Sequence, residues 1–195
     1  MPSPDAKTRL IAAMIDALQR RGLHGSGLTE LLTAAQAPKG VLYHHFPGGK
    51  TELAVAAVDA VVERLCASLN ERMGSANDPA AALMTWINSA QKRLEASGYE
   101  RGCPLATIAL ETTEQDVALR AALGTGFARI RVMIADGLLK AGYETRSASS
   151  LAALIVAAYE GGLLQARAAG TPEPMTLVGD ALLSLLRLHQ PKDPP

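Results

Sequence analysis

The sequence predicts an all-α protein. It contains 35 Ala and 28 Leu but only 16 Val and Ile together, and 7 of its residues are aromatic. Ala and Leu favour helices, whereas β-branched and aromatic residues favour strands. Apolar side chains also recur at helical spacing, and Gly, Pro and capping residues divide the chain into about nine such segments. We therefore expect about nine helices, arranged as an N-terminal three-helix head with a helix-turn-helix and a larger C-terminal helical bundle.

The first three helices are expected to be short. Residues 3–5 read Ser-Pro-Asp and offer a cap for the first helix, whose apolar residues repeat until Gly22. Ser26 can cap a short second helix. Pro38 stands where the third helix would start, because proline is tolerated at the first helical position, and this helix is expected over about 39–45.

The later helices are expected to be longer, and one over about 50–73 connects the head to the rest of the chain. Capping and stop residues place the others at about 78–96, at a short segment from 104, at about 114–140 and 147–169, and from 174 to about 189. The last two are apolar on nearly all sides, which is typical of helices that are buried on more than one side. Burial across a dimer interface is the simplest way to achieve this in a chain of 195 residues.

The charge of the chain is asymmetric. Residues 1–50 carry 6 Lys and Arg against 3 Asp and Glu, although the whole chain has a net charge of zero. A basic end on an acidic body suggests contact with a polyanion, but solvated basic faces are also common. We expect a helix-turn-helix DNA-binding domain over 1–49 and a ligand-binding and dimerisation domain over 50–190.

Residues 27–53 carry the most informative pattern. They read as a short helix, a tight turn at Gln36-Ala37 and a second short helix, a unit that can place its second helix in the major groove of DNA. The second helix has no acidic residue. It presents four side chains suited to phosphate oxygens or base edges: Lys39, Tyr43, His44 and His45. Lys50 begins the next helix, whose positive dipole end also favours a phosphate.

The string Gly40-x-x-Tyr43-x-His45-Phe46, followed by Lys50 and Leu53, resembles the TetR family of one-component transcriptional regulators. Four further segments look like the LmrA/YxaF-type branch of that family: 37–40, 46–50, 102–105 and 159–163. The resemblance covers most of the chain. It implies an all-helical dimer with a DNA-binding head and a ligand cavity in the larger C-terminal part.

Two positions depart from the family pattern. Gln36 occupies the turn where the family usually has Gly, so a positive φ there would strain the residue by ~1 kcal/mol. Val41 stands where many members have Ser or Thr. Its methyl groups could touch a thymine methyl, but they cannot offer a hydroxyl to DNA.

Three groups of candidate residues result. The DNA-binding group comprises Ser26, Thr29, Lys39, Gly40, Tyr43, His44, His45 and Lys50. A small apolar effector would contact residues of the middle helices, although any bundle core also needs such residues: Trp86, Ile87, Leu105, Ile108, Phe127, Ile130 and Tyr159. The dimer interface is expected at Leu154, Ala158, Gly161, Gly162, Leu182 and Leu185.

Enzymatic and metal-binding functions are not expected. The chain lacks the GxSxG, HExxH and CxxC motifs, and Glu111 and Glu114 are explained by an exposed helix connection. Gly49-Lys50-Thr51 looks like the end of a phosphate-binding loop, but that loop needs a glycine at position 44 and a preceding strand. Adjacent side chains such as His44 and His45 point about 100° apart on a helix, which is a poor arrangement for one metal ion. Phe46 is expected in the core.

No membrane segment is expected, because no stretch without a charged residue exceeds 13 residues and a membrane span needs ~20 apolar residues. The N-terminus does not read as a secretory signal, and the chain is expected in the cytoplasm with reduced cysteines. The leading hypothesis is a repressor that leaves double-stranded operator DNA when a small apolar effector binds, and that works as a homodimer without a cofactor. Two alternatives stay open: a DNA-binding regulator without a ligand, and a helical lipid carrier or enzyme whose basic head is incidental.

Overall fold

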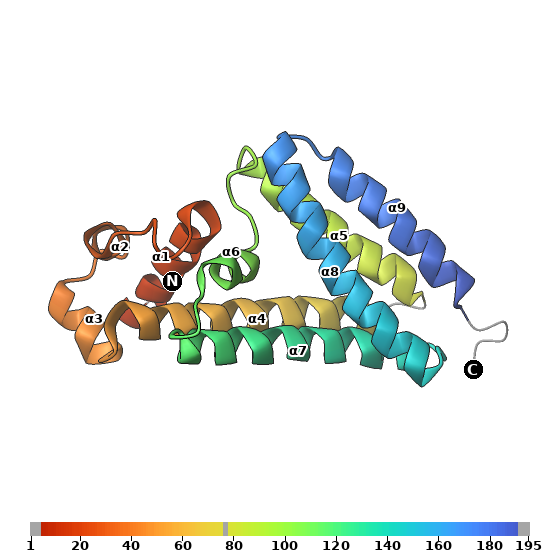
Figure 1. Cartoon of the computed structure of the whole chain (residues 1–195), viewed down its shortest axis with the longest axis horizontal. Helices are drawn as coiled ribbons and strands as arrows, with labels where there is room; N and C mark the ends of the chain where they lie inside the picture. Colours follow the sequence, from red (N-terminus) through yellow and green to blue (C-terminus); the bar gives the residue numbers. More distant parts are fainter. Residues whose placement is uncertain (1–4, 76–77, 191–195) are drawn as a thin grey trace. The chain divides into compact units, whose positions relative to one another are not determined.

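The computed structural model describes residues 5–75 and 78–190, and this part of the chain forms helices without strands (Figure 1). The all-α prediction is therefore confirmed. The helices, in chain order, are α1 Ala6–Arg21, α2 Leu28–Ala34, α3 Lys39–His45, α4 Gly49–Ser75, α5 Pro79–Ala96, α6 Pro104–Glu111, α7 Val117–Lys140, α8 Thr145–Ala169 and α9 Glu173–Leu188.

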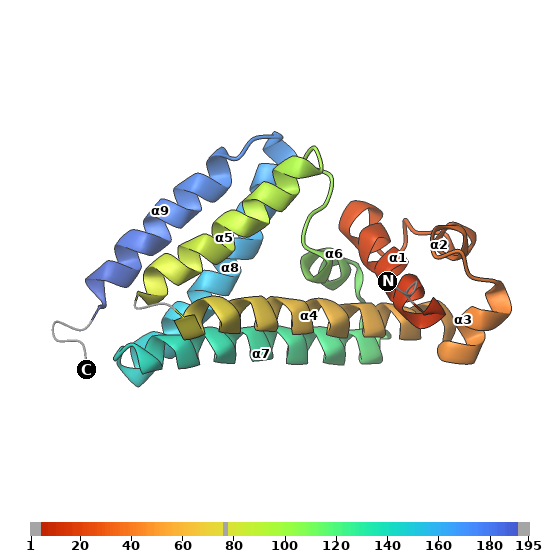
Figure 2. The same cartoon turned by 180° about the vertical axis from the view of Figure 1, so that it is seen from behind.

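The chain forms two compact units. The first unit consists of the chain up to Val62 together with Cys103–Gly126, and the second consists of Glu63–Gly102 together with the chain from Phe127 onward. The long helices α4 and α7 each contribute to both units. Within the first unit, α1 packs against α2, α3 and α6. Within the second unit, α5, α8 and α9 pack side by side, as both views of the molecule show (Figures 1 and 2).

Capping residues explain where several helices begin. Asp5 accepts a hydrogen bond from the Thr8 amide at 2.7 Å and starts α1, as predicted. Asp78 accepts from the amides of Ala80 and Ala81 and starts α5. The predicted cap at Ser26 is wrong: its hydroxyl turns inward and donates to the Gly22 carbonyl at 2.6 Å, and Gly27 is the N-cap of α2.

Helix α7 begins at Val117 rather than near residue 114. The cause is a turn closed by Asp116, whose carboxylate accepts from both the amide and the hydroxyl of Thr113 at 2.8 Å. These hydrogen bonds lower the pKa of Asp116. The turn separates α6 from α7, and α6 thus ends at Glu111.

Both units contain buried apolar residues. Leu10, Met14 and Leu42 are fully buried in the first unit, and Phe46 is buried as predicted. Trp86 and Ile87 are buried in the second unit. Apolar burial therefore contributes to the packing of both units.

Helix α8 differs from the expectation that no segment could cross a membrane. By length and composition it is long and apolar enough to do so, but core helices of soluble proteins pass the same test. A few charged residues interrupt the apolar sequence of α8, so the longest charge-free stretch is much shorter than the helix.

Candidate nucleic-acid interface

Two hydrogen bonds hold the turn between α2 and α3. Gln36 adopts φ +50°. This is the left-handed conformation that is expected where related proteins usually have Gly. Arg9 on α1 donates from Nε to the Ala35 carbonyl at 2.9 Å, and the Ala37 amide donates to the Leu32 carbonyl at 3.0 Å. These bonds fix the direction in which α3 leaves the turn.

Helix α3 buries one face and exposes the other. Leu42 is fully buried, whereas Lys39, Gly40 and His44 are exposed and 44% of the Tyr43 surface is accessible. Lys39 Nζ lies 6.0 Å from the centre of the Tyr43 ring. Since α3 carries no acidic residue, its exposed face offers hydrogen-bond donors and positive charge to a polyanion.

Glycine opens this surface at two places. A Cβ on Gly40 would meet nothing within 4 Å, so the backbone there is open to close approach. Gly49 adopts φ +69°, and a Cβ on it would lie 3.3 Å from the Tyr43 ring. The ring of Tyr43 therefore lies along the turn that precedes α4, with the Gly48 amide held by Glu52 at 2.6 Å.

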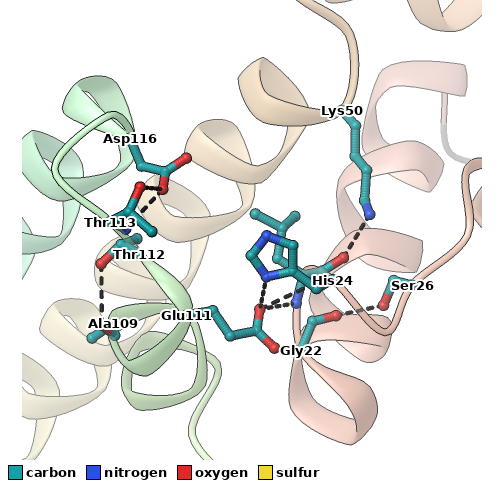
Figure 3. Close-up of polar contacts among 10 residues, drawn as sticks. Gly22, His24, Ser26, Lys50, Ala109, Glu111, Thr112, Thr113 and Asp116 are labelled. Atoms are coloured by element: carbon teal, nitrogen blue, oxygen red, sulfur yellow. Dashed lines mark hydrogen bonds and ion pairs between the residues drawn. The ribbon is translucent and has the colours of Figure 1, made fainter.

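Lys50 lies at the start of α4 and is half-buried. Its Nζ donates to the Leu23 carbonyl at 2.5 Å (Figure 3). Burial lowers the pKa of Lys50, and the nearby negative charge of Glu111 acts in the opposite direction. An ammonium group has three N–H donors, so this bond leaves two for a phosphate.

The remaining candidates of the DNA-binding group differ in exposure. Thr29 is exposed and His45 is half-buried. Ser26 is buried, with 1% of its surface accessible and its hydroxyl bound to Gly22, so it does not belong to an exposed DNA-contacting surface. The sequence pattern did not reveal this because Ser26 lies just before the helix that it was expected to cap.

The candidate effector residues fall into both units. Leu105 and Ile108 are buried in the first unit, and the other five belong to the second. There the rings of Trp86 and Tyr159 are stacked, with centroids 4.4 Å apart and an interplanar angle of 27°. The Trp86 indole Nε1 is buried and has no hydrogen-bond partner among the described residues.

The other candidates in the second unit are mostly buried. Ile87 and Ile130 are buried, whereas Phe127 is half-buried. A polar residue of the same helix as Trp86, Gln91 on α5, donates from its side-chain amide to Glu95 at 2.9 Å, so this amide already has a partner within the helix.

The candidate dimer residues also divide into two sets. Leu154 is 47% exposed, and a Cβ on Gly161 would meet nothing within 4 Å, so both lie on an open face of α8. Gly162 instead faces α9 of the same chain, where a Cβ would lie 2.8 Å from Met175 Sδ, and Leu182 is buried. The assignment of Gly162 and Leu182 to the outer face is therefore not supported, while Ala158 and Leu185 are half-buried.

Sequence reasoning missed three exposed leucines on α8 and α9. Leu164, Leu177 and Leu188 are exposed to 59%, 63% and 81%. Leu154, Gly161 and Leu164 follow one another on α8 at intervals of seven and three residues, which places them on one face. That spacing could have indicated the exposed position of Leu164 from the sequence.

Glu111 is the second finding that sequence reasoning missed. It does not belong to an exposed connection: it is half-buried, and its carboxylate accepts from the amides of Leu23 at 2.6 Å and His24 at 3.2 Å (Figure 3). The partners lie 88 and 87 residues away in the sequence, so no local pattern could indicate the contact.

Residues 79–181 match the family described as transcriptional regulator LmrA/YxaF-like, C-terminal domain. The chain is 26% identical to the HTH-type transcriptional regulator LmrA of Bacillus subtilis, over 94% of this chain and 97% of LmrA. It is 31% identical to an uncharacterised HTH-type transcriptional regulator of Mycobacterium tuberculosis, over 98% of both chains. A TetR transcriptional regulator of Legionella pneumophila shares the fold with a TM-score of 0.86 and 21% identity, over 95% of this chain and 99% of that one.

Proposed function

The chain belongs to the TetR family of transcriptional regulators, in its LmrA/YxaF-like branch, and from this premise we propose that it is a homodimeric repressor whose operator binding is released by a small apolar effector. Regulators of this family bind operator DNA as dimers and are not enzymes. The observation that carries the proposal is the exposed face of α3, which presents Lys39, Tyr43 and His44 without an acidic neighbour in the helix.

In this proposal the two lysines bind phosphates and the residues between them read the groove. Lys39 is the first residue of α3 and Lys50 lies in the first turn of α4, where the positive end of the helix dipole adds to the attraction. Tyr43 and His44 have donors for phosphate oxygens or base edges. Gly40 allows the backbone of α3 to approach DNA closely, with Thr29 and His45 at the margins of the contact.

The effector proposal rests on the indole of Trp86. A buried N–H without an acceptor is energetically unfavourable, and a ligand oxygen or nitrogen would satisfy it. The stacked ring of Tyr159 and the apolar side chains of the second unit suit an apolar, aromatic body. We therefore propose an apolar effector that carries at least one hydrogen-bond acceptor.

The dimer proposal rests on the exposed apolar faces of α8 and α9. Leu154, Gly161 and Leu164 on α8 lie in the same unit as Leu177 and Leu188 on α9. Exposed apolar surface of this kind marks an interaction site in a soluble protein. A two-fold axis would bring the two copies of each helix together in one self-complementary interface.

DNA binding with a defined salt dependence tests the proposed function. We would titrate the wild-type protein, Lys39→Ala and the control Lys92→Ala with DNA from upstream of its own gene at several salt concentrations. Lys92 is an exposed lysine on α5, outside the proposed interface. Loss of one phosphate contact per subunit should reduce the slope of log affinity against log salt by about 2 per dimer in Lys39→Ala, and leave it unchanged in Lys92→Ala.

Absence of binding by the wild-type protein would contradict the proposal. So would equal slopes for the two lysine variants, because they would mean that the attraction is general and does not involve α3.

A further inference from the structure

The connection between α1 and α2 is held by side chains from two distant helices. Glu111, the last residue of α6, accepts hydrogen bonds from the backbone amides of Leu23 and His24 (Figure 3). Lys50, near the start of α4, donates to the carbonyl of the same residue, Leu23. A single peptide segment is thus bound by a carboxylate and an ammonium group, both of which form stronger bonds than neutral groups do.

Gly22 leaves the space that this contact needs. It ends α1 with φ +77°, and a Cβ on it would overlap the carboxylate of Glu111. Its own carbonyl accepts from the buried hydroxyl of Ser26. A glycine at this position therefore meets two needs, since the backbone conformation disfavours other residues and the carboxylate occupies the space of a side chain.

Helix α6 belongs to the first compact unit. It has only eight residues, and one segment of the second compact unit ends at Gly102, just before it. Gly102 itself packs on α8, where a Cβ would lie 2.9 Å from the Arg167 guanidinium. Helix α8 also carries Tyr159, which stacks on Trp86.

We propose that Glu111 is a positioning residue for DNA binding: by holding the amides of Leu23 and His24, it fixes the α1–α2 connection and Lys50, and its release weakens the grip on DNA. This inference rests on the proposed function as a DNA-binding regulator. It adds a residue outside α3 on which the affinity for DNA depends. Burial lowers the pKa of Lys50, and the charge of Glu111 acts in the opposite direction.

The affinity for DNA distinguishes positioning from simple electrostatics, because the two predict opposite signs. We would measure binding of labelled DNA from upstream of the gene to the wild-type protein, Glu111→Gln, Glu111→Ala and the control Glu114→Gln. Glu114 is an exposed carboxylate three residues away. Loss of one negative charge should strengthen binding to a polyanion if Glu111 acts only through its charge.

A positioning role predicts the reverse. Glu111→Gln should weaken binding about tenfold, the effect of losing one charge-assisted hydrogen bond. Glu111→Ala should weaken it further, because no acceptor is left. Glu114→Gln removes the same charge without those hydrogen bonds, so it should bind as tightly as the wild type or slightly more tightly.

Amide hydrogen exchange supplies the second readout, which a general loss of stability would not reproduce. Exchange should become faster in peptides that cover residues 22–24 of both Glu111 variants, and stay unchanged in peptides that cover α3. Faster exchange throughout the first unit, or wild-type affinity in a folded Glu111→Ala protein, would overturn the inference alone. A wild-type protein that binds no DNA would overturn the proposed function together with it.

Discussion

Gln36 shows how a single residue defines the geometry of the α2–α3 turn. Its φ of +50° is one that most side chains disfavour. The turn keeps it because Arg9 donates to the Ala35 carbonyl and the Ala37 amide donates back to the Leu32 carbonyl. The strain was predictable from the sequence as a glutamine at a glycine position. The hydrogen bond of Arg9 was not, since 26 residues separate it from Ala35.

We expect Gln36→Gly to stabilise the protein. Relief of the left-handed conformation is worth about 1 kcal/mol, and the greater flexibility of glycine in the unfolded chain offsets roughly half of it. Gln36→Ala is the control, because alanine removes the side chain but keeps the unfavourable φ. Denaturant unfolding should place Gln36→Gly about 0.5 kcal/mol above Gln36→Ala in free energy of unfolding, which is the part of the strain relief that the flexibility of glycine does not offset. Equal values for the two variants would show that the turn is unstrained.

At the scale of one element, α8 has two adjacent glycines in different surroundings. Gly161 faces open space, whereas Gly162 faces Met175 and Val178 on α9. Adjacent helix positions differ by about 100° in direction, so the two glycines belong to different faces. One face is open for a partner and the other packs within the chain.

Alanine substitutions should separate these two roles. Both Gly161→Ala and Gly162→Ala gain up to about 1 kcal/mol from helix propensity. At Gly162 the added Cβ would stand 2.8 Å from Met175 Sδ and 3.4 Å from a Val178 methyl, so those side chains must shift. We expect Gly162→Ala to be less stable than Gly161→Ala by about 1–2 kcal/mol in denaturant unfolding at equal protein concentration. Equal free energies of unfolding for the two variants would mean that the side chains of α9 can move aside without loss of stability.

The sequence predicted elements better than contacts. The positions of α1 and α5 follow from Asp5 and Asp78, which are local caps. Ser26 does not cap α2 because its hydroxyl points the other way and donates to the Gly22 carbonyl in the preceding turn. Glu111 was misjudged because a carboxylate at a helix end looks solvated until a distant backbone supplies its partners. The sites thus depend on tertiary contacts that residue spacing does not encode.

At the scale of the whole molecule, assembly determines how two DNA-binding heads are spaced. Two heads related by a two-fold axis should meet successive major grooves, about 34 Å apart or somewhat more, on a pseudo-palindromic site. The open face of α8 is the proposed contact between copies. Its glycine, Gly161, allows close approach of the two helices.

We expect Gly161→Trp to yield monomers without specific DNA binding, because a Cβ at this position meets open space within the chain and the bulky indole beyond it would collide with a partner helix. Gly124→Trp is the matched control, since a Cβ on Gly124 in α7 would also meet nothing within 4 Å. Light scattering should show a monomer for the first variant and a dimer for the second. A dimeric Gly161→Trp protein would place the interface elsewhere.

The effector and the operator should weaken each other's binding by the same factor. A 100-fold loss of operator affinity corresponds to about 2.7 kcal/mol of coupling, which lies in the usual allosteric range. Trp86→Phe keeps an aromatic ring but removes the N–H, so it should weaken effector binding while effector-free operator binding stays intact. Calorimetric titration with and without operator measures both effects. Equal effector affinity in the two titrations would contradict the switching mechanism.

The chain has one tryptophan, and its position makes it a natural spectroscopic reporter. Trp86 lies in the second unit, buried against Tyr159, while Tyr43 in α3 is solvent-accessible. Emission excited at the red edge of the absorption band therefore reports on the second unit alone. Far-ultraviolet circular dichroism, in contrast, follows the helices of both units. Melting curves that coincide by the two methods would mean that the units unfold as one cooperative body, and curves that separate would give the stability of each.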